Sequence, residues 1–282
     1  MRCRDPASLL TPPVSARRFM TRILHIADLH FGAEHPALVE AFHDTAKALA
    51  PDLVIASGDF TQSGRKREFG AAARFFAALE APVIGMPGNH DTPVRALHER
   101  FFRPWRRYDR SLEAEISDRF AGPSVRVECL RTARRAQWQP DWSLGRVSLP
   151  DLDTALDRLN AGDADQATRI LTCHHPLLAP GGARGRARTA RAEEAARRSA
   201  DHCDLVLTGH LHETFAESLE RDGRLCWFIG AGTTFSLRTR DEPAAFNCLD
   251  LAPDRIEMTP YEARSLDEGF RPAAPRTLAL TA

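Results

Sequence analysis

Five short apolar runs, each followed by a polar turn, place the strongest constraint on the fold of this chain. The runs cover residues 22–27, 53–57, 82–86, 169–173 and 204–208, and segments of helical composition at 37–49 and 68–79 separate the first three. Strands that alternate with helices of this length form βαβ units with right-handed crossovers. The sequence therefore predicts an α/β fold. In such sheets, binding sites form at the carboxyl ends of the strands, where these polar turns follow.

The polar turns carry an unusual concentration of carboxylate, amide and imidazole groups. On an extended backbone, residues i and i+2 point the same way. We therefore expect Asp28 to converge with His30, and His210 with His212. The side chains expected at this one edge of the sheet are Asp28, His30, Asp59, Asn89, His90, Asp91, His174, His210 and His212.

This donor set predicts a metal site. Carboxylates, amide oxygens and imidazoles suit divalent Mn, Fe, Co or Zn, and the absence of thiolates argues against a structural zinc site. The predicted ligands are too many for one ion: Asp28, His30, Asp59, Asn89, His174, His210 and His212. Two divalent ions that share Asp59 would each keep an open position for water or substrate. We predict two divalent metal ions and leave their identity open among these four elements.

Two such ions, about 3.5 to 4 Å apart, produce a hydroxide at neutral pH and clamp an in-line displacement at phosphorus. His90, supported by Asp91, is the predicted catalytic pair on the leaving-group side, as a general acid or as a donor to the phosphoryl oxygen. The sequence thus predicts a hydrolase in which a hydroxide that bridges two metals attacks the phosphorus of a phosphoester.

The composition excludes several classes of partner. The 38 basic and 38 acidic residues give a net charge of +0, which offers no general attraction to nucleic acid or to an anionic membrane. We expect a small phosphoester substrate and no nucleic-acid partner. No apolar run approaches the roughly 18 residues that span a bilayer. Four of the six cysteines, Cys129, Cys173, Cys226 and Cys248, fall in apolar runs without a C-x-x-C motif. Buried free thiols are typical of a reducing compartment, so the cytoplasm is the expected location.

The ends and the irregular segments carry weaker signals. Residues 1–19 are expected to be a disordered leader or the product of a start codon assigned too early, and residues 271–282 a loose tail. Successive strands without long helices, at 225–229, 246–251 and 255–258, suggest an antiparallel second sheet stacked on the first.

Two arginine-rich segments, 94–123 and 181–199, are candidates for a lid over the site. For 94–123 we favour a helix that packs its aromatic side chains inward and leaves its arginines in solvent. His175 is adjacent to His174 but is expected to point to the opposite face and to pack behind the site.

The ordered motifs resemble those of the calcineurin-like metallophosphoesterase superfamily. The similarity covers residue 20 to about residue 260, and we assign residues 20–270 to one metallophosphoesterase domain. The resemblance implies a four-layer α/β/β/α sandwich of two stacked mixed sheets. It also implies two ligand sets that share Asp59, the first made of Asp28, His30, Asp59 and His212, and the second of Asp59, Asn89, His174 and His210.

Within this superfamily, the chain is similar to the bacterial branch that includes class III cyclic nucleotide phosphodiesterases. The similarity lies in Asp28-Leu29-His30-Phe31-Gly32, in Gly58-Asp59-Phe60-Thr61-Gln62 and in Gly232-Thr233-Thr234. Purple acid phosphatases have Tyr where this chain has Gln62, so a coloured Fe(III)-tyrosinate is not expected. Arg131 departs from the branch, whose members tend to have Asn there, and this affects the expected substrate contacts.

The resulting hypothesis is a metal-dependent phosphodiesterase for a small diester, with a cyclic nucleotide among the candidate substrates. The alternatives are a pyrophosphatase of a nucleotide-linked lipid precursor, a nuclease and a metal-binding module without catalysis. Loss of Asp59 or His90 would mark the last of these, and both residues are present. The sequence leaves the oligomeric state open, a homodimer included.

Overall fold

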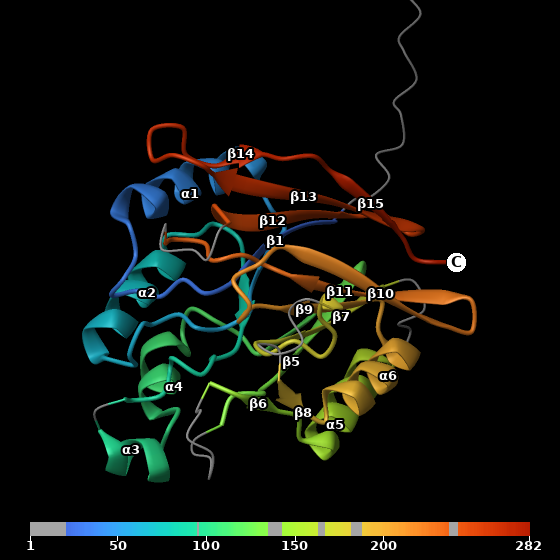
Figure 1. Cartoon of the computed structure of the whole chain (residues 1–282), viewed down its shortest axis with the longest axis horizontal. Coiled ribbons are helices and arrows are strands. Elements are labelled where there is room, and N and C mark those ends of the chain that lie inside the picture. The colour runs from blue at the N-terminus through green and yellow to red at the C-terminus, as the bar shows by residue number, and fades with distance from the viewer. Residues whose placement is uncertain (1–20, 95, 135–142, 163–166, 182–187, 237–241) are drawn as a thin grey trace, which may run out of the picture.

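The computed structural model describes residues 21–94, 96–134, 143–162, 167–181, 188–236 and 242–282 (Figure 1). The interpretation of residues 1–19 as a leader or a misassigned start lies outside these ranges. The chain forms four layers, in which two stacked sheets are covered on their outer faces by helices. This confirms the predicted α/β class and the four-layer α/β/β/α sandwich.

The first sheet combines a parallel part with an antiparallel part. Its strand order is β14 (Arg271–Pro272), β13 (Arg255–Ala263), β12 (Ala244–Leu251), β1 (Thr21–Ile26), β2 (Leu53–Ala56) and β3 (Val83–Gly85), and β15 (Arg276–Ala279) also pairs with β13. Strands β1, β2 and β3 are parallel, and β12 runs antiparallel to β1. The carboxyl ends of β1, β2 and β3 therefore lie at one edge of the sheet.

The second sheet has a parallel centre with antiparallel edges. Its order is β10 (Phe215–Arg221), β11 (Arg224–Gly230), β9 (Leu205–Thr208), β7 (Thr168–Cys173), β5 (Val125–Leu130) and β4 (Arg119–Ala121). Strands β11, β9, β7 and β5 are mutually parallel. The short strands β6 (Gly145–Arg146) and β8 (Thr189–Ala190) form a separate pair.

The helices cover the outer faces because their apolar residues repeat at helical spacing. Helix α1 (Pro36–Leu49) buries Leu38, Phe42 and Ala46, each four residues apart, and has a proline in its first turn. It packs on the first sheet together with α2 (Lys66–Ala77). Helices α5 (Leu149–Leu159) and α6 (Ala192–His202) cover the other face of the second sheet, and Figure 1 shows them together at its lower right.

The strand alternation separates three apolar cores. In β1, Leu24 and Ile26 pack toward α1 and α2, whereas Ile23 packs toward the second sheet. Side chains of successive strand residues point to opposite faces, so a central strand of this fold must be apolar on both. This explains why the strands that carry the polar turns are continuous apolar runs.

The C-terminal strands differ from the prediction of a separate antiparallel sheet. Strands β12 and β13 extend the first sheet, and the β10–β11 hairpin extends the second. Strand β12 is apolar on both faces, with Phe246 toward the helices and Leu249 toward the second sheet. It therefore fits beside β1, where Leu24 pairs with Cys248.

Residues 271–282, expected to be a loose tail, are instead part of the first sheet. Strand β15 pairs with β13, and Leu278 is 2% exposed in the core between the sheets. The indole N–H of Trp227 donates a hydrogen bond to the carbonyl of Ala279 at 2.7 Å. This segment is ordered because Leu278 packs into the core between the two sheets and β15 pairs with β13.

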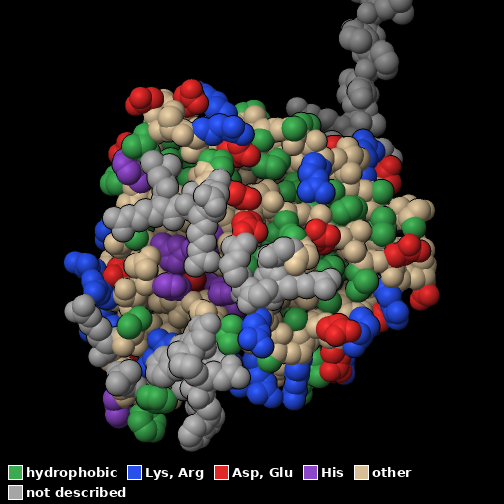
Figure 2. Space-filling model, in the orientation of Figure 1, with side chains coloured by type: hydrophobic (Ala, Val, Ile, Leu, Met, Phe, Trp, Pro, Cys, Tyr) green, Lys and Arg blue, Asp and Glu red, His purple; other side chains and the backbone are tan. Residues whose placement is uncertain are grey.

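Residues 94–123 contain two short helices, α3 (Leu97–Phe102) and α4 (Arg106–Leu112), rather than one. The prediction that aromatic side chains pack inward is right for Tyr108, which is buried and stacks on Phe60 at 6.0 Å between ring centroids. It is wrong for Phe101 and Phe102, which are 43% and 71% exposed. Figure 2 shows hydrophobic side chains on the surface where α3 lies.

Two further findings concern membranes and cysteines. Within the described ranges, every helix is too short or too polar to cross a bilayer. The cysteines of these ranges, Cys129, Cys173, Cys203, Cys226 and Cys248, are free, and all but Cys129 are buried. Burial raises the pKa of the Cys173 thiol to about 12.

We expect Leu278→Ala to lower the free energy of unfolding by about 2 to 3 kcal/mol, because it removes buried methyl groups from the core between the sheets. Urea denaturation measures the change. Thr281→Ala, at an exposed position near the end of the chain, is the control and should change stability by less than about 0.5 kcal/mol. Equal stability of the two variants would contradict the packing of β15.

Candidate metal centre

The structure brings the predicted donor residues of both sheets to one place. Asp28 and His30 follow β1, Asp59 follows β2, and residues 89–91 follow β3, all in the first sheet. His174 follows β7 and residues 210–212 follow β9, in the second sheet. Figure 2 shows histidine side chains gathered on this face. The site therefore lies at the seam where the carboxyl ends of the two sheets meet.

Left-handed backbone conformations aim these side chains. The φ angle is 52° at Asp28, 46° at His30, 54° at Asp59, 71° at His210 and 61° at His212. A non-glycine residue in this region costs of order 1–3 kcal/mol, and such residues cluster at functional sites. Asp28 and His30 do converge as predicted, but the reason is a left-handed turn after β1 and not the alternation of an extended strand.

The first half-site consists of Asp28, His30 and His212. Oδ1 of Asp28 lies 3.7 Å from Nε2 of His30 and 3.3 Å from Nε2 of His212. The two Nε2 atoms are 3.4 Å apart. Oδ2 of Asp28 accepts a hydrogen bond from the His210 backbone N–H at 2.9 Å, whereas the buried Oδ1 has no hydrogen-bond partner. An unsatisfied buried carboxylate oxygen that faces two imidazoles fits a bound cation.

The second half-site consists of Asp59, Asn89 and His174. Nε2 of His174 lies 3.1 Å from Oδ1 of Asn89 and 3.3 Å from Oδ2 of Asp59. Nδ1–H of the same ring donates to the carbonyl of Ser57 at 2.8 Å, which leaves Nε2 to face the two oxygens. Three electron-pair donors this close repel one another unless a positive charge lies between them. Donor atoms of Asp28, Asp59 and His174 lie within 4.8 Å of one another, so the two half-sites are contiguous.

The electrostatics of the site demand positive charge. Burial lowers the pKa of His174, but Asp59 outweighs burial and raises that pKa to about 9. Burial tends to raise the pKa of Asp59, yet His174 and His90 hold it well below its usual range. A proton on His174 or a bound metal ion satisfies this demand. Burial lowers the pKa of His210 to about 4, which keeps its ring neutral as a metal ligand requires.

His175 does not point away from the site as predicted: its ring lies 4.6 Å from that of His210 between centroids, although both of its ring nitrogens are occupied. Nδ1 lies 2.8 Å from Oγ1 of Thr132, and Nε2 lies 2.8 Å from the carbonyl of Ser143. Because the carbonyl only accepts, Nε2 carries the proton and Nδ1 accepts from the threonine hydroxyl. Sequence reasoning missed Thr132 and Ser57. Thr132 acts through a hydroxyl, which is a common group, and Ser57 acts through its backbone carbonyl, which every residue has.

The partner of His90 differs from the expectation. Nδ1–H of His90 donates to the carbonyl of Gln62 at 2.9 Å, and its ring packs edge-on against His30 at 4.9 Å between centroids. The backbone N–H of His90 donates to Oδ1 of Asp59 at 2.8 Å. The prediction that Asp91 supports the His90 ring is therefore wrong, because the ring is held by the backbone carbonyl of Gln62 and not by Asp91.

Asp91 instead holds two loops together. It is fully buried and accepts hydrogen bonds from the backbone N–H groups of Phe60, Thr61 and Gly88 at 3.1, 2.8 and 2.9 Å, and from the Thr61 hydroxyl at 2.8 Å. Burial and the charge of Asp59 raise its pKa to about 6. Asp91 thus fixes the loop after β2 against the turn after β3.

Two glycines of the motifs are required by close approach. A Cβ on Gly88 would lie 2.1 Å from Oδ1 of Asp59, and one on Gly209 would lie 2.8 Å from Oδ2 of Asp28. Any side chain at these positions would displace a carboxylate of the site. These two glycines therefore contribute to the site because the absence of a Cβ leaves room for the carboxylate oxygens of Asp59 and Asp28.

Arg131 follows the strand of the second sheet that is paired with the strand leading to His174. This strand is β5, whose last residue, Leu130, pairs with Cys173 just before His174. Its guanidinium lies 5.8 Å from the Tyr108 ring centroid and 3.7 Å from Oδ1 of Asp109. Arg131 thus contacts helix α4, and its effect on substrate contacts stays a prediction.

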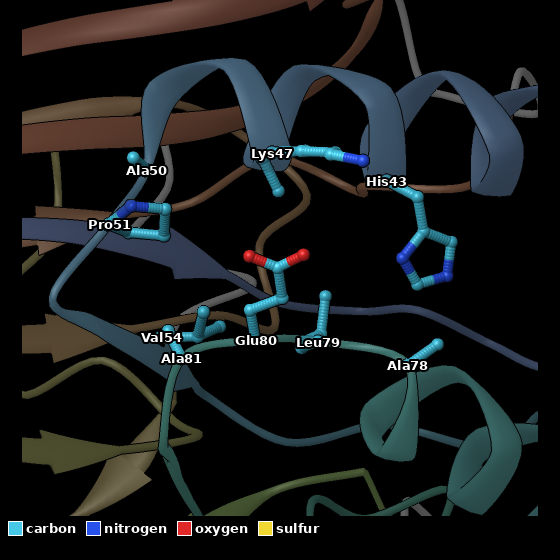
Figure 3. Close-up of a pocket in the computed structure, with 10 residues that line it drawn as sticks. His43, Lys47, Ala50, Pro51, Val54, Ala78, Leu79, Glu80 and Ala81 are labelled. Atoms are coloured by element: carbon cyan, nitrogen blue, oxygen red, sulfur yellow. The ribbon is translucent and has the colours of Figure 1, made fainter.

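A separate cavity lies at the other end of β2. It has a volume of about 450 Å³ and is lined by residues that include His43, Lys47, Pro51, Val54 and Glu80. Figure 3 shows Glu80 pointing toward helix α1, from which Lys47 and His43 project. None of the predicted site residues lines this cavity, so it is distinct from the metal centre.

The sequence profile of the calcineurin-like phosphoesterase family matches residues 21–214. The chain belongs to this family. Members of the family use divalent metals, and the chain is a phosphoric ester hydrolase. The family therefore agrees with the buried donor clusters at the seam of the two sheets.

Two curated relatives are similar over most of the chain. A probable cyclic nucleotide phosphodiesterase of Synechococcus is 28% identical over 249 residues, which is 82% of this chain and 88% of that protein. The 3',5'-cyclic adenosine monophosphate phosphodiesterase CpdA of Escherichia coli K12 is 27% identical over 243 residues, 77% of this chain and 78% of that one.

Solved structures show the same fold at low identity. The purple acid phosphatase PPD1 from yellow lupin superposes with a TM-score of 0.63 at 12% identity, over 92% of this chain and 54% of that chain. GAP50 of Plasmodium gives 0.60 at 11% identity, over 93% and 90% of the two chains. These likenesses support the fold alone.

We expect the protein loaded with Mn to bind about two equivalents of metal, and Asp59→Asn to bind fewer than one, because Asp59 is the predicted shared ligand. Equilibrium dialysis with elemental analysis measures the metal content. His43→Gln, which alters a histidine of the distant cavity, should still bind two equivalents. Full metal content in Asp59→Asn would contradict the shared site.

We expect Asp91→Asn to lower the free energy of unfolding by about 1–3 kcal/mol, because an amide turns N–H groups toward backbone donors that the carboxylate now satisfies. Thermal unfolding of the metal-loaded protein measures this effect. Asp109→Asn, at an exposed position, is the matched control. If the two variants unfold at the same temperature, Asp91 does not hold the loops as described.

Proposed function

We propose that this phosphoester hydrolase is a phosphodiesterase that uses two divalent metal ions to cleave a small diester. The observation that carries the proposal is the pair of contiguous half-sites, with donors from both sheets within 4.8 Å of one another around Asp28 and Asp59. Two contiguous sites suit an in-line displacement at phosphorus. The phosphodiesterase activities of the two curated relatives support a diester, and a cyclic nucleotide is the first substrate class to test.

The proposed ligand sets are those that the family resemblance implies, and the clusters of Asp28 with His30 and His212 and of Asp28 with Asp59 and His174 agree with them. Asp28, His30 and His212 would hold one ion, Asn89, His174 and His210 the other, and Asp59 both. Divalent ions bound there would supply a hydroxide nucleophile at neutral pH and neutralise charge on the phosphoryl oxygens. The identity of the metals is left to experiment among Mn, Fe, Co and Zn.

We assign His90 to the leaving-group side. Its Nδ1–H is held by the Gln62 carbonyl, so Nε2 is the ring atom available to a substrate. A protonated ring would donate from Nε2 to the leaving oxygen, which helps most when that oxygen is a strong base. Asp91 is proposed to act through the loop that carries Gln62, as a positioning residue and not as a catalytic one.

A second candidate is a pyrophosphatase of a nucleotide-linked lipid precursor. The observation that favours it is the exposure of Phe101 and Phe102 on α3, since exposed aromatic side chains can contact an acyl chain.

The free cysteines in the described ranges concern the cellular location. Free thiols are typical of a reducing compartment, and we propose the cytoplasm.

We expect protein reconstituted with Mn to hydrolyse bis-p-nitrophenyl phosphate faster than p-nitrophenyl phosphate. Asp59→Asn should lower diester turnover by at least about 100-fold, since it removes the carboxylate shared by both ions. Release of p-nitrophenol measures both activities, and His43→Gln is the control with unchanged turnover. Absence of turnover on either ester, with metal shown to be bound, would contradict the diesterase proposal and favour the pyrophosphate substrate.

A further inference from the structure

We propose that Arg107, on helix α4, is a positioning residue for His90 and acts through the loop of residues 61–64. The inference rests on the proposed function, because that function places His90 on the leaving-group side. It gives the α3–α4 segment a role in the chemistry that its sequence does not indicate.

The guanidinium of Arg107 connects three parts of the structure. Its Nη1 donates to the carbonyl of Gly64 at 2.8 Å. Its Nε and Nη2 donate to Oε2 of Glu99, on α3, at 2.9 and 2.5 Å. The Arg107 side chain is only 19% exposed, and its hydrogen bond lowers the pKa of Glu99. The planar fork is thus held by Glu99 and directed at one carbonyl of the loop.

The loop that receives this bond has little freedom to move independently. The Gly64 N–H donates to Oγ1 of Thr61 at 3.1 Å, and a Cβ on Gly64 would lie 2.6 Å from the carbonyl oxygen of Thr92. Gln62, two residues before Gly64, donates its N–H to the Phe31 carbonyl at 3.0 Å and accepts from Nδ1 of His90 at 2.9 Å. A shift of the Gly64 carbonyl therefore moves the carbonyl that orients the His90 ring.

Other residues hold the rest of this loop, and Arg107 holds the Gly64 carbonyl. Asp91 accepts the N–H groups of Phe60 and Thr61 at the start, and Glu68 accepts those of Ser63 and Arg65 at the end. These contacts satisfy N–H groups, whereas Arg107 satisfies a carbonyl. Its loss would leave the Gly64 carbonyl without this bond and would remove one of the contacts that hold the loop carrying Gln62.

The chemical consequence depends on the leaving group. In the displacement, the hydroxide oxygen forms the new bond to phosphorus and the ester P–O bond breaks. The electron pair of that bond goes to the leaving oxygen, which takes the proton from Nε2 of His90. Proton donation matters greatly for a basic leaving oxygen and little for p-nitrophenolate. A misplaced His90 should therefore lower kcat selectively for poor leaving groups and leave KM nearly unchanged.

The experiment uses the full chain loaded with Mn and compares two substrates. Diphenyl phosphate has a poor leaving group, phenolate, and bis-p-nitrophenyl phosphate has a good one, p-nitrophenolate. His90→Asn should lower kcat by at least about 100-fold on diphenyl phosphate and by less than about 10-fold on the nitrophenyl ester. Arg107→Gln should show the same selectivity at about a 10-fold loss, with KM within about twofold. Arg107→Lys, which can keep one of the bonds, should fall between Arg107→Gln and the unaltered protein. Arg110→Gln, an exposed arginine of the same helix, should change neither ester.

An equal loss on both esters in Arg107→Gln and Arg107→Lys, or behaviour like Arg110→Gln, would overturn the inference while leaving the proposed function intact. Absence of leaving-group selectivity in His90→Asn would overturn the role of His90 and this inference with it. Failure of the unaltered, metal-loaded protein on both esters would overturn the proposed function itself. Selective loss in both Arg107 variants, graded as described, supports the inference.

Discussion

The burial of two carboxylates, Asp28 and Asp59, is the constraint on which the rest of the site depends. Both are almost inaccessible to solvent, and an ionised carboxylate in such surroundings costs several kcal/mol unless it is paired. Each carboxylate accepts one backbone N–H, from His210 and from His90. The bond from His210 joins the end of β9 to the end of β1, so the requirement to satisfy a buried charge also holds the edges of the two sheets together.

The four-layer architecture allows this arrangement because it stabilises an unfavourable local backbone. Five residues of the site have positive φ, and two glycines leave room for carboxylate oxygens that a Cβ would displace. Such geometry persists only where the surroundings determine it fully. Here three apolar cores, two beneath helices and one between the sheets, hold the strands from which these turns emerge.

The proposed metal-binding and leaving-group sides of the site are built in different ways. The ligands come from strand ends, where both sheets fix the backbone. His90 depends on a carbonyl in a loop, and that loop depends on Asp91 and on the α3–α4 segment. In this chain, we predict that Arg131 and the exposed Phe101 and Phe102 affect substrate choice.

Local patterns in the sequence indicated the α/β class and the candidate donor residues, and the resemblance to a known family implied the four-layer sandwich. Apolar runs predict strands, and Asp, His and Asn directly after them predict donors at the strand ends. The prediction for residues 271–282 was wrong because proline content obscured Leu278, whose burial depends on distant residues of the core. The assignment of β12 and of the β10–β11 hairpin to different sheets was likewise not predictable, since strand pairing depends on which edges remain free.

The partners of the catalytic candidates were decided by the tertiary structure. Asp91 is adjacent to His90 in sequence, yet it satisfies the N–H groups of Phe60, Thr61 and Gly88, while His90 bonds to the Gln62 carbonyl. A backbone carbonyl or N–H is present at almost every residue, so no residue type marks the one that is used. The sequence by itself therefore indicated which side chains lie at the candidate site and which strands present them. Only the tertiary structure decided how those side chains are oriented, because orientation depends on backbone groups that chain folding brings together.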